Sequence, residues 1–107
     1  MKRFVLRFIW LRKAVAVCLD QKIAGFSNPL TVFYFWPERD AWEDIQLFLE
    51  KNRWITREES ISLLNELTDV INGWQDKQSY SFTKKDLGKL KEKFPNTSFV
   101  GFSYRQI

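Results

Sequence analysis

Histidine is missing from this sequence, and cysteine occurs only once, as Cys18. Without histidine the chain lacks the commonest general base and the commonest metal ligand, and one thiol permits neither an internal disulfide nor a zinc site of the usual kind. Neither common type of Gly-rich phosphate loop is present. The sequence therefore predicts no catalytic residue, no bound metal, no cofactor and no small-molecule substrate.

Long apolar runs are also missing. No run reaches the roughly 20 residues that span a bilayer, so we expect no membrane partner. The first ten residues begin like a signal peptide, but Arg7 interrupts their apolar stretch and no small-residue cleavage site follows. We interpret them as part of the mature structure.

Aromatic residues, by contrast, make up 17% of the 107 residues. A chain of this length supports one domain with one core, and each ring can bury about 150–250 Å². We expect a single α+β domain over residues 1–107, with residues 76–107 as a C-terminal extension packed on it or beside it.

The net charge of +4 is unevenly distributed along the chain. Residues 1–37 carry a net +5, residues 38–75 a net −5 and residues 76–107 a net +4. The two ends are therefore basic and the middle is acidic. A moderate basic excess of this kind favours phosphate-rich partners without requiring them.

Three strands are predicted near the amino end. Apolar and other residues alternate with period two across residues 3–11, and residues 14–20 alternate in size and suit a hairpin with the first strand. Residues 25–29 are predicted to form a loop. Residues 30–36 are apolar enough that we expect a third strand with both faces covered.

Two helix starts carry the spacing of a capping box, Asp40 with Glu43 and Thr56 with Glu59. Carboxylates at these positions also meet the positive end of the helix dipole, so capping explains them better than acid–base catalysis. The apolar residues that follow at helical spacing are expected to form one buried cluster against the sheet, namely Trp42, Ile45, Leu64, Leu67, Ile71 and Trp74.

The carboxyl end adds a polar linker over residues 76–81, a third helix from Thr83 to Phe94 and a strand over residues 98–104 as a candidate sheet edge. The order of elements predicts an α+β fold: an antiparallel sheet of three N-terminal strands, with the C-terminal strand as a possible addition and about three helices on one side.

Two groups of basic side chains are candidates for contact with RNA phosphates. The amino-terminal group has no acidic residue among the first 19 residues, and the second group occupies most of the circumference of the predicted third helix. An ordinary solvated surface would show the same pattern. The candidate RNA-binding residues are Lys2, Arg3, Arg7, Arg12, Lys13, Lys84, Lys85, Lys89 and Lys91.

Aromatic residues 33–36 are consistent with bases stacked on a sheet, but packing in the core explains these rings better. Cys18 lies in an alternating apolar strand with no histidine to activate it, so we expect a buried, unreactive thiol.

Several segments resemble the plastid-specific ribosomal protein 3 family of the small ribosomal subunit. The most specific is Phe35-Trp-Pro-Glu-Arg-Asp-Ala-Trp-Glu43, because two tryptophans at fixed spacing around a proline are rare by chance. The others are Val15-Ala-Val-Cys-Leu-Asp-Gln21, Pro29-Leu-Thr31, Trp54-Ile55, Leu64-Asn65, Val70-Ile-Asn72 and Trp74-Gln75, with a tail that is similar to the extension of some algal members.

The resemblance implies a non-catalytic structural component of the small ribosomal subunit, bound to 16S ribosomal RNA and to neighbouring small-subunit proteins. It also implies a plastid, specifically the chloroplast stroma, or the cytoplasm of a cyanobacterium. A chain that starts directly in its first strand is expected to be made inside that compartment. Two alternatives stay open: a small RNA-binding factor that regulates translation from a transient site on the ribosome, and a protein–protein adaptor.

Overall fold

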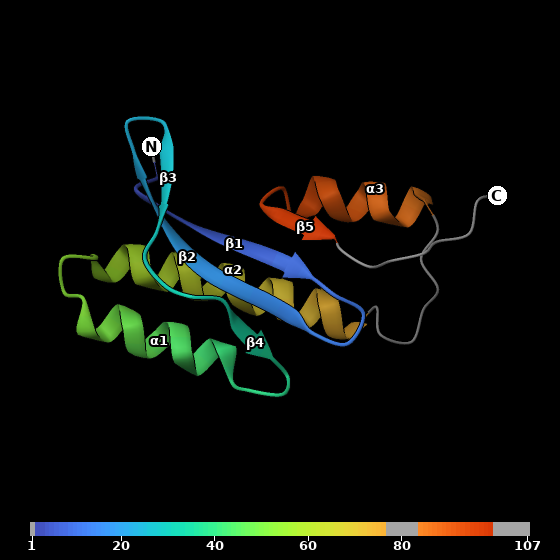
Figure 1. The fold of residues 1–107 in the computed structure, drawn as a ribbon, viewed down its shortest axis with the longest axis horizontal. Helices are drawn as coiled ribbons and strands as arrows, with labels where there is room; N and C mark the ends of the chain where they lie inside the picture. Colours follow the sequence, from blue (N-terminus) through green and yellow to red (C-terminus); the bar gives the residue numbers. More distant parts are fainter. Residues whose placement is uncertain (1, 77–83, 100–107) are drawn as a thin grey trace.

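The computed structural model describes residues 2–76 and 84–99 as a sheet with helices on one side (Figure 1). This confirms the predicted α+β class. The elements in chain order are β1 (Phe4–Trp10), β2 (Val15–Ile23), β3 (Phe26–Pro29), β4 (Tyr34–Trp36), α1 (Ala41–Lys51), α2 (Arg57–Asp76), α3 (Lys84–Lys93) and β5 (Thr97–Phe99).

The sheet has five strands in the order β3-β2-β1-β5, with β4 also paired to β2. The pairs among the first four strands are antiparallel, as predicted, whereas β5 runs parallel to β1. The sheet is therefore mixed. A parallel neighbour needs a crossover connection, and the chain between β1 and β5 includes all three helices.

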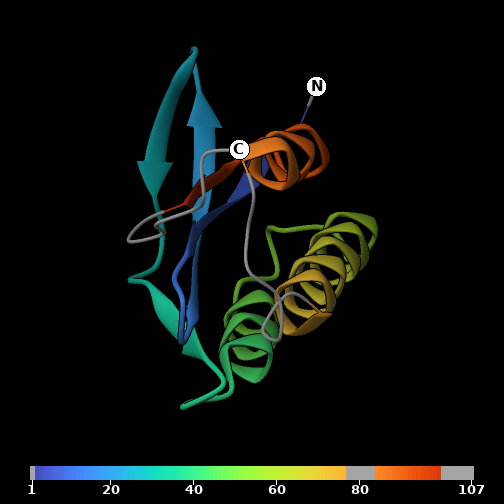
Figure 2. The ribbon, with the colours of Figure 1, turned by 90° about the vertical axis from the view of Figure 1, so that its right-hand side faces the viewer.

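All three helices lie on the same side of the sheet (Figure 2). The core on this side takes every second residue of β1, from Phe4 to Trp10, together with Val15, Val17 and Leu19 of β2. Within the predicted helical cluster, four residues are buried, while Trp42 and Leu64 are half-buried and pack against the core. The period-two reading of the first two strands thus identified the buried face.

Both predicted helix starts are capped as expected. The Asp40 side chain accepts a hydrogen bond from the Glu43 amide at 3.0 Å, so α1 begins at the following residue. Thr56 and Glu59 bond reciprocally, at 3.1 Å from the Glu59 amide to Thr56 Oγ1 and 2.9 Å from the Thr56 amide to Glu59 Oε1. The expected reciprocal box is thus complete at Thr56, whereas at Asp40 the bond runs in one direction, from the Glu43 amide to Asp40.

The predicted loop over residues 25–29 is wrong, because most of it forms β3. Ile23 pairs with Phe26, so Ala24 and Gly25 make a two-residue hairpin turn with φ angles of 49° and 83°. Two successive positive φ angles match the right-handed twist of a hairpin. Gly25 tolerates that conformation freely, and the turn forces Ala24 to share it.

The predicted third strand over residues 30–36 is shorter and less covered than expected. Between β3 and β4 the partner segment advances five residues while β2 advances three, so two extra residues leave the ladder. Thr31 fills the gap: its Oγ1 accepts the Leu19 amide at 3.0 Å. Val32 in this bulge is 72% exposed and Phe35 is 42% exposed, so the prediction that both faces are covered is wrong.

The carboxyl end joins the core through Phe94, which is buried at the end of α3. Its ring approaches to 3.1 Å from where a Cβ on Gly73 of α2 would lie, and its centroid is 6.0 Å from that of Trp10. The last strand begins at Thr97, one residue earlier than predicted. Residues 77–83 of the predicted linker and helix start, and residues 100–104 of the predicted strand, lie outside the described residues.

Candidate nucleic-acid interface

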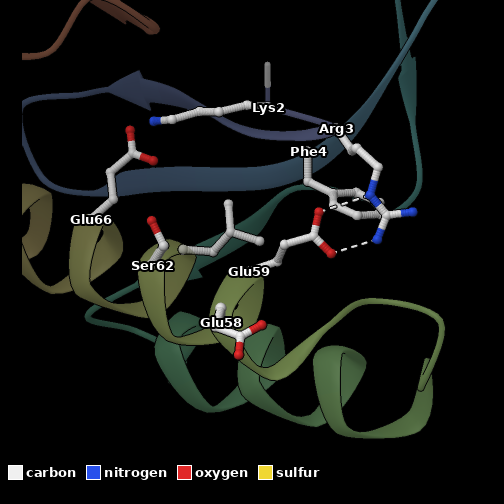
Figure 3. A pocket seen from close by; sticks show the side chains of 8 residues that line it. Lys2, Arg3, Phe4, Glu58, Glu59, Ser62 and Glu66 are labelled. Carbon is white, nitrogen blue, oxygen red and sulfur yellow. Dashed lines mark hydrogen bonds and ion pairs between the residues drawn. The ribbon is translucent and has the colours of Figure 1, made fainter.

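Arg3 is one of the predicted RNA contacts, and its guanidinium is bound to the helix layer. Its Nε donates to Glu59 Oε2 at 2.8 Å, and its Nη2 donates to Glu59 Oε1 (Figure 3). Nη2 also donates to the Trp54 carbonyl at 3.2 Å. The hydrogen bonds from Arg3 lower the pKa of Glu59 to about 2. This carboxylate therefore caps α2 and holds the amino end at the same time.

A pocket of about 250 Å³ lies beside this ion pair, lined by residues of the amino end and of α2 (Figure 3). Two cations, Lys2 and Arg3, face three carboxylates there, those of Glu58, Glu59 and Glu66. Burial raises the pKa of Glu66, and the charge of Lys2 opposes that shift. With more carboxylates than cations, this end of the molecule is a poor place for a phosphate group.

Arg7 is paired on the opposite side of the sheet. Its Nε donates to Asp20 Oδ2 at 2.8 Å and its Nη2 to Asp20 Oδ1 at 3.2 Å, and its guanidinium carbon lies 5.3 Å from the Phe33 ring centroid. The Asp20 side chain is 3% exposed, whereas that of Arg7 is 47% exposed. The hydrogen bonds to Asp20 raise the pKa of Arg7. The charge of Arg7 is thus matched by a buried carboxylate.

The remaining candidates are at two other places. Arg12 and Lys13 are exposed in the turn between β1 and β2, and Lys89 and Lys91 are exposed on α3. Lys84 and Lys85 belong to α3, but their side chains lie outside the described part. The predicted amino-terminal group is therefore divided, because Arg3 and Arg7 are paired with acids from different sides of the sheet.

The structure adds Lys22, an exposed residue at the end of β2 that the sequence analysis did not select. The sequence does hold a signal for it, since no acidic residue occurs between Asp20 and Glu38. The nine acidic residues of positions 38–75, by comparison, all lie in α1, in α2 or in the segments next to them. Helices α1 and α2 with their flanking segments are therefore the acidic part of the molecule.

The segment of residues 35–43, with its two tryptophans and its proline, is called the signature here. Several of its residues make contacts within the protein. Asp40 caps α1, Ala41 is buried, and Trp42 Nε1 donates to Thr68 Oγ1 of α2 at 3.0 Å. Trp36 packs against the core from β4. These contacts give the signature residues a structural role in joining the sheet to the helices.

Among the described residues, no three or more acidic or cysteine side chains gather where they could hold a metal ion. Cys18 is buried, as predicted, and burial together with the neighbouring Asp20 raises the pKa of its thiol to about 11. Within the described part of the chain, no helix has the length and apolar character to cross a membrane.

Comparison with known proteins places this architecture in a family. Residues 30–77 match the model of "Plastid and cyanobacterial ribosomal protein (PSRP-3 / Ycf65)". A "Small ribosomal subunit protein cS23" of Euglena viridis is 54% identical over 102 residues, which cover 95% of this chain and 99% of the relative. The chain belongs to the PSRP-3 / Ycf65 family.

Other members of the PSRP-3 / Ycf65 family come from a red alga and a land plant. A protein of the same name from Gracilaria tenuistipitata var. liui is 40% identical over 94% of this chain and 98% of its own length. One from Hordeum vulgare is 47% identical over 66% of this chain and 40% of its own length. Membership confirms the resemblance seen in the sequence and the expected setting, a plastid or a cyanobacterium.

Proposed function

We propose that this protein is a structural component of the small ribosomal subunit, that it binds 16S ribosomal RNA, and that it supports translation without catalysing a reaction. The separation of charge is the observation that carries the RNA-binding part of this proposal. Exposed cations lie at the β1–β2 turn and on α3, whereas the acidic residues of positions 38–75 belong to α1, α2 and the segments next to them. A protein of this kind can present its basic regions to RNA and its acidic helices to solvent or to a basic neighbour.

Family membership supports the same proposal, since the relatives are named as small ribosomal subunit proteins. Stable incorporation predicts that the protein stays with small subunits in stoichiometric amount after washing at high salt. A regulatory factor that binds transiently would wash off, and an adaptor would be recovered equally from lysate without ribosomes.

RNA contact is tested by a salt titration with small-subunit RNA and the double charge reversal Arg12→Glu with Lys13→Glu. Each lost phosphate contact should weaken binding and reduce the slope of log affinity against log salt by about 0.7–0.9. The effect should be largely independent of RNA sequence, because phosphate contacts carry no base information.

The matched control reverses Arg53 and Arg57, two exposed cations of the helix layer. It changes the net charge by the same amount but should leave the slope nearly unchanged. A second reversal, of Lys89 and Lys91, tests the α3 group. Wild-type affinity and slope in both test variants, with folding verified, would indicate that neighbouring proteins alone hold the protein on the subunit.

A further inference from the structure

The sheet has a second face, formed by the strand residues that point away from the helices. Strand register places Val5, Arg7 and Ile9 of β1 on it, next to Asp20, Cys18 and Ala16 of β2, and Phe35 of β4 next to Ala16. We call this set the open face, because no helix of the described part lies on it (Figure 2).

Arg7 is held in a fixed orientation on the open face. Two hydrogen bonds to Asp20 fix its planar fork, and the ring of Phe33 lies against the cation. Nearly half of the side chain is still exposed. Asp20 occupies two of its donors and Phe33 lies against the cation, so a partner would meet Arg7 on the side away from Phe33.

Phe35 is the aromatic neighbour on this face. The residue is 42% exposed, in contrast to the half-buried Tyr34 and Trp36, which pack against the core from the other face. Only small side chains lie between the strands of Arg7 and Phe35, those of Ala16 and Cys18, each about 1% exposed. The two strands flank β2 at a separation of about 10 Å, so a base on Phe35 and a base on Arg7 would contact different strands of the sheet.

A hollow of about 330 Å³ adjoins Phe35 at the sheet edge, lined by residues 32–35, Arg39 and Asp44. Arg39 is exposed and can meet a phosphate, and the half-buried Asp44 can accept a hydrogen bond from a base amino group. Aromatic rings beside a cation are the usual elements of a surface for single-stranded nucleic acid.

The charge of the open face favours RNA as the molecule that binds there. Within the described residues, the only carboxylate of the open face is that of Asp20, which is buried and paired with Arg7, and Lys22 extends the same row of β2. We propose that the open face is a stacking platform for unpaired RNA bases, with one base on the Phe35 ring and a neighbouring base on the Arg7 guanidinium. This inference rests on the proposed RNA-binding function and specifies how part of it is achieved.

The test uses the full chain and a single-stranded oligoadenylate of about ten nucleotides, since base stacking on aromatic rings tolerates any sequence. Phe35→Leu keeps an apolar side chain but removes the π face, and should weaken binding at least about fivefold. Phe35→Trp enlarges the π face and should bind at least as tightly as the wild type. Binding to an abasic strand of equal charge should be the same in all three proteins.

The control is Phe26→Leu, the same substitution at a phenylalanine that is 76% exposed on the β2–β3 hairpin, outside the open face. It should leave oligoadenylate binding unchanged. Circular dichroism and the unfolding midpoint verify that each variant is folded.

Several outcomes would overturn the platform: wild-type binding by folded Phe35→Leu, an equal loss in Phe26→Leu, or a loss on the abasic strand as large as on oligoadenylate. Loss of Phe35→Leu from washed subunits without any loss of oligoadenylate binding would assign the open face to a neighbouring protein instead. If Arg12 and Lys13 still govern the salt slope in these cases, the proposed RNA-binding function stands without the platform. If the wild type binds no RNA at any salt concentration, both fail.

Discussion

The two faces of the sheet are built from alternate residues of the same strands, yet they differ in how their side chains are buried. On the helix side, Leu6 and Trp10 are fully buried within an apolar core. On the open face, Ile9 is half-buried and Arg7 exposed, but Asp20, which Arg7 binds, is only 2% exposed. A helix layer excludes water from one face, while large side chains cover small and charged ones on the other.

The same difference separates the two arginines near the amino end. Arg3 closes an exposed ion pair that connects the chain start to the cap of α2. Arg7 neutralises a buried carboxylate. An exposed pair contributes little because water solvates both partners, whereas an unpaired buried charge is costly. Arg3 and Arg7 carry the same charge and lie close together in the sequence, but Arg7 is expected to contribute more to stability.

The largest effect should come from the helix side. Leu6→Ala should lower the free energy of unfolding by about 2–5 kcal/mol, because it removes a fully buried side chain and leaves a cavity. Ile9→Ala, on the open face of the same strand, should cost only about 1 kcal/mol, because its side chain is half-buried. Denaturant unfolding measures both. Equal losses would mean that the open face is as well covered as the core.

An intermediate effect is expected at the buried carboxylate. Arg7→Met should cost about 1–3 kcal/mol, since it leaves Asp20 charged and buried without its partner. Asp20→Asn should cost less, because the half-exposed Arg7 can then be solvated by water. Unfolding free energies at pH 7 give the comparison, and the reverse order would contradict the assigned roles.

The smallest effect concerns Arg3 and Glu59, and it depends on pH. Because the pKa of Glu59 falls from 4.5 to about 2 on folding, the pair stabilises the fold fully above pH 4.5. This contribution is lost as the pH falls toward 2. Glu59→Gln keeps an oxygen for the cap but removes the charge, so its stability deficit should shrink over that range.

The control for this measurement is Glu58→Gln, a neighbouring exposed carboxylate in the first turn of α2. Urea unfolding at several pH values between 2 and 6 follows both variants. A Glu59→Gln deficit that stays constant across this range would contradict the role assigned to the ion pair.

Several features of the fold could be predicted because they depend on neighbours in the sequence. The alternation from Phe4 to Trp10 identified a buried strand face, and the residues around Asp40 and Thr56 identified both helix starts. The structure of the segment after β2 was predicted less accurately. Its bulge depends on Thr31 reaching the Leu19 amide across two strands, which no local pattern encodes.

The candidate site was only partly predictable for the same reason. The sequence identified where basic residues are abundant, and the exposed Arg12 and Lys13 agree with that expectation. It gave no indication that Arg3 would bond to Glu59, 56 residues away, or that Phe35 would be exposed while its neighbours Tyr34 and Trp36 pack against the core.

By itself, the sequence determined that this protein lacks histidine and a second thiol, that its strands and capped helices form around an apolar core, and that it belongs with plastid and cyanobacterial ribosomal proteins. Composition and short-range spacing suffice for these properties. Only the tertiary structure decided that β5 lies parallel to β1, that the acidic helices cover one face of the sheet, and which arginines are paired. Those properties depend on which distant segments meet, because burial and ion pairing act through space between residues far apart in the chain.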